Sequence, residues 1–175
     1  MSSLAIRAAD ETALDEVAAL HAAAFGASPH GYHGEAELVR ALHENGDALV
    51  SLAAWQQDAL VGHVLFSRMC VHANDRPVAA AAIGPVAVAQ DWRRRGIGAA
   101  LIEAGHAALR KAGVQLVFVL GDPAYYGRFG YTPDRAAPFA SPYAGPFFMA
   151  CTLDSTLPRS QRGEAIHAAA FSRLG

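Results

Sequence analysis

The chain has 175 residues, which fits one domain and is long enough to bury a sizeable core. Its formal net charge is −2, so its overall charge does not favour a nucleic-acid-binding protein. Two cysteines, Cys70 and Cys151, lie far apart without metal-ligand spacing. Because both lie in apolar, strand-like runs, we interpret them as small buried hydrophobic residues that form no disulfide.

The sequence predicts neither a signal peptide at its start nor a membrane-spanning segment. The start, MSSLAIRAAD, has no apolar stretch of signal-peptide length. No run approaches the roughly 18 apolar residues of a membrane-spanning helix. We therefore expect a cytoplasmic protein with no membrane partner.

The first quarter of the chain predicts one strand and two helices. Leu4 to Ala8 alternates as a short strand, and Asp10 or Thr12 can cap the helix that follows. That helix is predicted from apolar spacing up to the break at Gly26-Ala27-Ser28-Pro29. A second helix is predicted from about Glu35 to Glu44. The inward residues expected for the first helix are Leu14, Val17, Ala18, His21 and Phe25.

Three strands joined by short turns follow, which predicts an antiparallel meander. They are Ala48 to Trp55, Leu60 to Val71 and Val78 to Val88. The second is apolar on both alternating faces, as expected for a strand buried on both sides. The third contains Gly84-Pro85, where a bulge is expected, because proline cannot donate to a strand ladder and glycine marks irregular backbone.

A basic, glycine-punctuated loop, Arg93 to Gly98, follows this strand and precedes a helix expected to run to about Ala112. The first turn of a helix has free N–H groups and a positive dipole end, so strand, loop and helix together predict an anion site of phosphate size. Two familiar phosphate loops are excluded. Leu101 stands where a dinucleotide-binding loop needs its third glycine, and the Gly-Lys-Ser/Thr of a nucleotide triphosphate loop is absent. The alternative is a solvated basic turn.

The rest of the chain begins with a fully apolar strand, Val114 to Leu120, which we expect to lie parallel to and near Val78 to Val88. Asp122 and Pro123 predict the start of a short helix that ends at Gly130. Beyond it we expect three further segments. These are a long loop from Pro133 to Gly145, a strand from Pro146 to Leu153 and a weakly helical segment from Gln161 to Leu174.

The motif Arg-x-x-Gly-x-Gly at residues 93–98, after Val86-x-Val88, resembles the diphosphate signature of the GNAT superfamily of acyl-CoA N-acyltransferases. Residues 126–131, YGRFGY, resemble the tyrosine motif of that family. Leu120 to Gly130 also resembles a bacterial subgroup with the pattern LGDPxYYxRFG. The resemblance covers roughly Leu4 to Leu153, so we expect a catalytic domain at residues 1–153 and a tail at 154–175 packed on the domain or on a partner.

The resemblance implies an α/β (α+β) GNAT fold, whose mixed central sheet is splayed between two parallel strands and has helices on both faces. It also implies acetyl-CoA as co-substrate, without a metal. The backbone of Val86 and Val88, with Ala87 between them, would pair with the pantetheine arm. The N–H of Val86 would polarise the thioester carbonyl. The residues that would hold the diphosphate are Arg93, Arg94, Arg95, Gly96, Ile97, Gly98 and Ala99. Val86 and Val88 can also be read as core side chains, which is compatible with a backbone role.

The resemblance further assigns Tyr126 as a cofactor-contacting general acid that protonates the thiolate leaving group. The competing interpretation is an interfacial aromatic residue with a satisfied hydroxyl. The general base stays open between Glu35, His33, Asp122 and a water molecule. His21 and His63 lie in apolar runs and are interpreted as hydrogen-bonded core residues.

The sequence therefore predicts an N-acetyltransferase in which a primary amine attacks the thioester directly. A covalent acyl-enzyme is disfavoured, because the cysteines lack partners and no serine has a nucleophile-elbow context. The expected acceptor is a small amine or a peptide amino terminus. A polycationic acceptor is disfavoured because the loops Gly26 to Gly34 and Pro133 to Gly145 carry few acidic residues. A homodimer is compatible with the sequence. The alternatives are a non-catalytic acyl-CoA-binding regulatory module and an interaction protein whose arginine loop is only surface.

Overall fold

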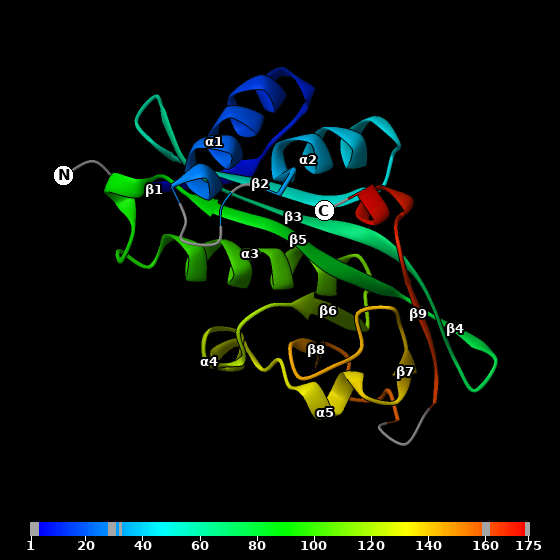
Figure 1. Cartoon of the computed structure of the whole chain (residues 1–175). Coiled ribbons are helices and arrows are strands. Elements are labelled where there is room, and N and C mark those ends of the chain that lie inside the picture. Colours follow the sequence, from blue (N-terminus) through cyan, green and yellow to red (C-terminus); the bar gives the residue numbers. More distant parts are fainter. Residues whose placement is uncertain (1–3, 28–30, 32, 159–161, 174–175) are drawn as a thin grey trace. The chain divides into compact units, whose positions relative to one another are not determined.

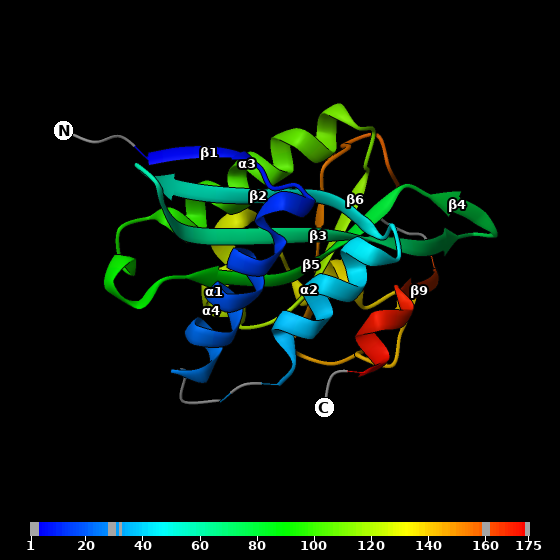
Figure 2. The same cartoon turned by 90° about the horizontal axis from the view of Figure 1, so that it is seen from above.

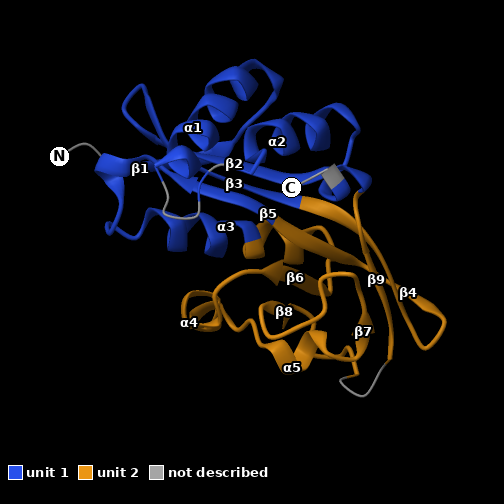
Figure 3. Cartoon of the chain, in the orientation of Figure 1, with its two compact units in different colours: residues 1–66, 84–105, 169–175 blue, residues 67–83, 106–168 orange. Residues whose placement is uncertain are grey.

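The computed structural model describes residues 4–27, 31, 33–158 and 162–173, and it is shown from two directions in Figures 1 and 2. The chain divides into two compact units (Figure 3). Unit 1 contains residues 1–66, 84–105 and 169–175, and unit 2 contains residues 67–83 and 106–168. Three elements contribute residues to both units: β3 (Ala59–Ala73), β5 (Ala80–Val88) and α3 (Ile97–Lys111).

The strands of unit 1 follow the predicted meander. β1 (Leu4–Ala8) pairs antiparallel with β2 (Ala48–Gln56), with Leu4 opposite Gln56 and Ala8 opposite Leu52. The strand order continues through β3 to β5. Where β5 ends, the Ala89 N–H donates to the Val61 carbonyl at 2.8 Å. The predicted strands at residues 4–8 and 48–55 are therefore confirmed.

Helices cover both faces of the unit 1 strands: α1 (Leu14–Gly26) and α2 (Glu35–Glu44) lie on one face, and the first part of α3 lies on the other (Figures 1 and 2). The Asp10 carboxylate caps η1 (Glu11–Ala13) by accepting the Thr12 N–H at 2.9 Å. The bounds predicted for α2 are confirmed. The buried residues of α1 are Val17, Ala18, Leu20, His21 and Ala24.

Two glycines let α3 approach β3 closely in unit 1. A Cβ atom added at Gly62 would lie 2.9 Å from Ile97 Cγ2, and one added at Gly105 would lie 2.1 Å from Phe66 Cε2. Phe66 is fully buried, so its ring is enclosed by neighbouring protein atoms. The contact between helix and strand therefore depends on the absence of a side chain at these positions.

Unit 2 is built around a short parallel ladder. β5 pairs with β6 (Leu116–Leu120) in parallel register, from Ala80 opposite Leu116 to Ala82 opposite Phe118. β6 pairs antiparallel with β8 (Phe148–Thr152). The second half of β3 pairs antiparallel with β4 (Arg76–Val78) and with β9 (Gly163–His167). The parallel relation predicted between residues 114–120 and 78–88 is confirmed.

The core of unit 2 is aromatic. The Phe118 ring stacks on Phe148 with 5.3 Å between centroids and meets Phe139 edge-on at 5.4 Å. Phe139 belongs to β7 (Phe139–Ala140), which pairs in parallel with β9. The segment after residue 161 therefore contributes a strand to the unit 2 sheet.

Two predictions about the second half of the chain are wrong. The expected loop at 133–145 contains α5 (Pro133–Ala136) and β7. The Thr132 hydroxyl caps α5 by accepting the Arg135 N–H at 3.2 Å, a helix start that the Thr-Pro pair encodes. The expected helix at 161–174 is instead β9 followed by η4 (Ala169–Arg173), because Ala165 alternates inward on a strand between exposed Glu164 and Ile166.

Two expectations about the strands also need correction. The strand predicted at 78–88 is broken at Ala79, whose carbonyl accepts the Gln115 N–H at 2.7 Å. β3 is buried on both faces only up to Ser67, and from Arg68 onward it alternates between exposed and buried residues. Cys70 is therefore exposed, against our expectation, whereas Cys151 is buried as expected. Within the described ranges, no helix is long and apolar enough to cross a membrane.

We predict that Gly105→Ala destabilises the protein although alanine favours helix. Alanine gains about 1 kcal/mol in helix propensity, but overpacking against the Phe66 ring costs about 1–3 kcal/mol or more. Thermal and urea unfolding measure the net effect. Gly26→Ala is the matched control, because Gly26 also lies in a helix and an added Cβ atom meets nothing within 4 Å. A Gly105→Ala protein as stable as the Gly26→Ala protein would contradict this account of the packing.

Candidate active site

The parallel ladder between β5 and β6 stops partway along both strands. The last pair is Ala82 opposite Phe118, yet β5 continues to Val88, and β6 continues to Leu120 with β8 as its partner. One residue after the last pair comes Gly84-Pro85, and proline has no N–H to give to a ladder. The observed end of pairing agrees with the irregularity that the sequence predicts there.

Beyond this point, in unit 1, β5 has one packed face and one half-exposed face. Pro85 and Ala87 are buried, whereas Val86 and Val88 are half-buried. A Cβ atom at Gly84 would lie 3.3 Å from the Leu65 carbonyl oxygen, so the backbone of β5 closely approaches β3 there. Ala87 packs with Leu20 and Ala24 of α1. The structure thus gives Val86 and Val88 a strand conformation on a segment that has left its parallel partner.

The arginine loop joins β5 to α3. After η2 (Gln90–Trp92), Arg94 and Gly96 take positive φ angles of 64° and 78°. Gly96 tolerates this angle without strain, whereas an arginine in the left-handed region is uncommon. The Gly96 carbonyl accepts the Ala100 N–H at 3.0 Å and so begins the helical hydrogen bonds.

The N-terminus of α3 has the features of an anion site. By helix geometry the N–H groups of Gly98 and Ala99 have no carbonyl one turn earlier to which they can donate. Buried Ile97 anchors this turn. Arg93 to Gly96 are exposed, and nothing lies within 4 Å of a Cβ atom placed on Gly96. The loop therefore offers open space, unpaired donors and positive charge at a helix N-terminus, which suits a diphosphate.

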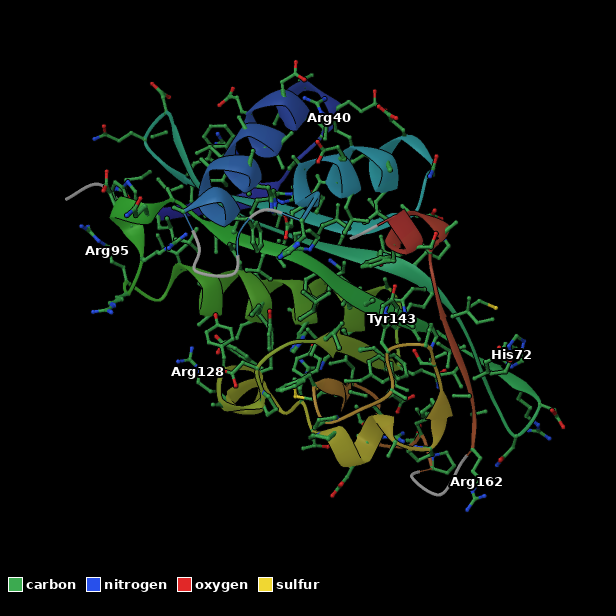
Figure 4. All side chains as sticks on the ribbon, viewed as in Figure 1. Arg40, His72, Arg95, Arg128, Tyr143 and Arg162 are labelled. Carbon is green, nitrogen blue, oxygen red and sulfur yellow. The ribbon has the colours of Figure 1, made fainter. Side chains whose placement is uncertain are left out.

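The three arginines of the loop have different surroundings. The Arg95 guanidinium lies over the Trp92 ring, 4.7 Å from its centroid, and projects from the loop (Figure 4). Arg94 is exposed. Arg93 points back into unit 1, where its Nη2 donates to the Ala24 carbonyl at 2.9 Å and its Nε donates to the Val88 carbonyl at 3.3 Å.

Tyr126, in unit 2, is the last residue of α4 (Pro123–Tyr126), which precedes η3 (Gly127–Phe129). As predicted, the Asp122 carboxylate caps α4 through the Ala124 N–H at 2.9 Å, and Gly130 ends η3 with a φ angle of 94°. Gly121 makes room for the tyrosine, because a Cβ atom at Gly121 would lie 2.5 Å from Tyr126 Cε2. The glycine at the end of β6 thus determines where the Tyr126 ring lies.

The environment of Tyr126 keeps its hydroxyl protonated. Burial raises the pKa of Tyr126 to about 12, and the neighbouring Tyr125 adds to the shift. No hydrogen bond to this hydroxyl is found among the described residues. Tyr125 instead packs against Phe129, at 5.5 Å between centroids, and under the Arg128 guanidinium at 4.9 Å (Figure 4). Tyr125 therefore serves packing in unit 2.

The candidate bases are already engaged in local structure. The Glu35 carboxylate accepts the His33 N–H at 2.8 Å at the start of α2, and Asp122 caps α4. Glu35 is half-buried and Asp122 is exposed. The structure therefore does not single out one base. Among the described residues, no three His, Cys, Asp or Glu side chains gather as a metal site would require.

The sequence matches the family model described as an acetyltransferase (GNAT) domain over residues 5–133. The chain belongs to the GNAT acetyltransferases. A relative from Escherichia coli K12, the uncharacterized N-acetyltransferase YjhQ, is 36% identical over 66% of this chain and 66% of its own length. The uncharacterized N-acetyltransferase YhbS of the same organism is 35% identical over 55% of this chain and 58% of its own length. The chain thus spans under two thirds of the length of both relatives.

Two solved structures of this family share the fold. A GNAT acetyltransferase from Brucella melitensis, in complex with acetyl-CoA, is 27% identical with a TM-score of 0.80, over 98% of this chain and 99% of that one. Escherichia coli YhbS in complex with CoA is 26% identical with a TM-score of 0.87, over 100% of this chain and 95% of that one. The GNAT fold expected from the arginine-loop and tyrosine motifs is confirmed.

Unit 1 of this GNAT protein also contains a row of hydrogen-bonded side chains that the sequence did not predict as a whole, with His21 and His63 buried and Ser51 and His43 partly buried. His21 Nε2 of α1 lies 2.8 Å from His63 Nδ1 of β3, and His63 Nε2 lies 2.8 Å from Ser51 Oγ of β2. Ser51 Oγ in turn lies 3.2 Å from His43 Nε2 of α2. The expectation that His21 and His63 are hydrogen-bonded core residues is confirmed. Their inward spacing in the sequence was the only available signal.

Burial keeps these imidazoles neutral. Loss of solvation lowers the pKa of His21 to about 3 and that of His63 to about 2, with the positive charges of His21 and His43 adding to the shift at His63. Buried His21 Nδ1 has no hydrogen-bond partner in the part of the chain that the structure describes. Burying a neutral imidazole costs less free energy than burying a charged one, so His21 and His63 are compatible with the core in their neutral forms.

We predict that the protein loses stability in mild acid through these histidines. Their pKa values are below the ordinary 6.5, so the unfolded state binds their protons first. Their contribution is complete above about pH 6.5 and falls by up to about 1.4 kcal/mol per histidine per pH unit toward pH 3. Urea unfolding between pH 7.5 and 5 measures this slope, and His63→Gln should reduce it. Exposed His72 gives the control His72→Gln, and an unfolding free energy independent of pH in the parent protein would refute the prediction.

Proposed function

We propose that this chain is an N-acetyltransferase that moves the acetyl group of acetyl-CoA to a primary amine. The observation that carries the proposal is the arginine loop with its positive φ angles at the N-terminus of α3. It is supported by the Brucella melitensis relative, which shares the fold and has been solved in complex with acetyl-CoA. We propose residues 1–153 as the catalytic domain and 154–175 as its tail.

In this proposal the diphosphate of acetyl-CoA binds at the loop from Arg93 to Ala99. The N–H groups of Gly98 and Ala99 donate to phosphate oxygens, and the helix dipole adds to the attraction. Exposed Arg94 and Arg95 supply positive charge, with Arg95 held in place by Trp92. Gly96 lets the backbone approach the anion closely.

The pantetheine arm carries two amides, so it can pair with a strand edge as a peptide does. We assign this role to the backbone of Val86, Ala87 and Val88, which follow the end of the parallel ladder. The amine attacks the thioester carbonyl carbon, and the carbonyl oxygen gains negative charge. We assign the Val86 N–H to stabilise that oxygen.

Collapse of the tetrahedral intermediate breaks the carbon–sulfur bond and releases a thiolate. We assign Tyr126 to protonate that sulfur, since its raised pKa keeps the phenol protonated at neutral pH. The attacking ammonium must first lose a proton to become nucleophilic. We assign this step to Glu35, with His33, Asp122 or a water molecule as the other candidates.

The acceptor class follows from the family and from the loops. We propose a small-molecule amine or a peptide amino terminus in place of a polycation, because few acidic residues occur at 26–34 and 133–145. Cytoplasmic location and a homodimeric state stay expectations from the sequence. An amine and peptide library assayed by thiol release from acetyl-CoA tests the function directly. CoA binding without release against any acceptor would support a non-catalytic acyl-CoA-binding module instead.

Gly96→Ala should weaken CoA binding at least about tenfold, because alanine at a φ angle of 78° costs roughly 1–2 kcal/mol and disturbs the diphosphate loop. Isothermal titration calorimetry with CoA measures the effect. Gly46→Ala is the matched control: Gly46 has a φ angle of 75° and equally open surroundings, but it lies in the turn after α2. If both variants bind CoA like the parent protein, the assignment of the loop is wrong.

Tyr126→Phe should lower turnover by about 10²-fold or more, because the proton donor is removed while the ring keeps its place beside Gly121. The affinity for CoA should change less than about threefold. Thiol release with the best acceptor from the library gives turnover, and calorimetry gives affinity. Tyr125→Phe changes the adjacent hydroxyl and should leave turnover near that of the parent. Equal turnover of the parent and Tyr126→Phe would rule out the acid role.

A further inference from the structure

Arg93 occupies the first position of the diphosphate motif, but its guanidinium is engaged elsewhere. Two of its donors form a fork: Nη2 to the Ala24 carbonyl at 2.9 Å and Nε to the Val88 carbonyl at 3.3 Å. All three residues belong to unit 1. One edge of this side chain therefore joins the last turn of α1 to the end of β5.

The contact lies where an arginine is most effective. The last carbonyls of a helix have no partner within the helix, and positive charge near the C-terminus interacts favourably with the helix dipole. Ala24 lies two residues before the end of α1 at Gly26. Arg93 thus satisfies a backbone group that the helix alone leaves open and places a cation at the helix end that favours it.

Apolar packing surrounds the same junction. Leu20 and Ala24 of α1 form a buried cluster with Ala87 of β5, and Phe25, Leu60 and Ala89 pack against it. Val88, whose carbonyl accepts from Arg93, lies between Ala87 and Ala89 in the chain. The hydrogen-bond fork and the cluster therefore connect the same two segments.

We propose that Arg93 is a positioning residue that couples the diphosphate loop to the C-terminal turn of α1. Ligand binding at the loop then also stabilises this turn. We call the two hydrogen bonds from Arg93 to the Ala24 and Val88 carbonyls the brace, and they are contacts of the structure itself. The coupling of this brace to ligand binding rests on the proposed function. In this proposal Arg94 and Arg95 supply positive charge to the anion, whereas Arg93 keeps the end of β5 and the last turn of α1 in position.

Lysine is the informative substitution at this position. Its ammonium is a single point charge, so it keeps the positive charge but cannot reproduce a planar fork to two carbonyls. Arg93→Gln removes both the charge and the fork. If Arg93 acted by charge alone, Arg93→Lys would protect the last turn of α1 as the parent protein does. If the two hydrogen bonds are what matters, Arg93→Lys and Arg93→Gln should both lose this protection.

Hydrogen–deuterium exchange of peptides covering residues 20–27, with and without saturating CoA, tests the proposal. In the apo protein, both Arg93→Gln and Arg93→Lys should exchange the last turn of α1 up to about tenfold faster than the parent. CoA should slow exchange there in the parent, and this slowing should be lost in both variants at CoA concentrations that saturate them. The control is Arg40→Gln, because Arg40 contacts Asp15 near the start of α1 at 2.8 Å and so leaves the last turn unchanged.

Each other outcome overturns a defined part of the proposal. Parent-like apo exchange in Arg93→Gln, or full rescue by Arg93→Lys, would refute the brace. Faster apo exchange with an undiminished slowing by saturating CoA would refute the coupling, because a merely structural contact predicts that result. Absence of CoA binding to the parent protein would refute the proposed function and with it the coupling, while the apo comparison would still decide the brace.

Discussion

The interruption of the parallel ladder after Ala82 and Phe118 is the constraint on which the proposed chemistry depends. Strand backbone in a sheet interior is fully paired, and so it has nothing to offer a ligand. Here the pairing stops, a proline follows within three residues, and the strand continues for six residues beyond its last parallel pair, Val88 being its final residue. A strand that continues past its last parallel pair keeps its extended conformation, and in our proposal its backbone there pairs with the amides of the pantetheine arm.

Much of the fold could be predicted because local chemistry agrees with tertiary context. α2 begins at Glu35 and ends at Glu44 as predicted, and α4 begins where Asp122 and Pro123 place it. The failures have a common cause. β9 is a strand because β3 and β7 lie beside it, and α5 is too short for periodicity to show. Contacts between segments distant in sequence decide such elements, and no local pattern records them.

In the candidate site, too, the features set by local sequence could be predicted and the contacts between distant residues could not. The glycines and arginines of the loop are visible in the sequence because a helix N-terminus and positive φ angles demand particular residue types there. What the sequence could not show is how the arginines differ. Arg93 reaches a carbonyl at Ala24, a residue 69 positions away in the chain. Likewise the four hydrogen-bonded side chains His21, His63, Ser51 and His43 come from four different elements and could not be read from one stretch of residues.

The row of hydrogen-bonded histidines in unit 1 can carry a dipole of either direction. His21, His63, Ser51 and His43 are joined by three hydrogen bonds, and each member can both give and receive a proton. Two mutually exclusive proton arrangements therefore satisfy the same heavy-atom positions, one pointing every N–H and O–H toward α1 and the other toward α2. Switching between them reverses the dipole of the whole row without moving a heavy atom. The direction of the local electric field beneath these helices is therefore set by the choice of neutral histidine tautomers, with no change in net charge.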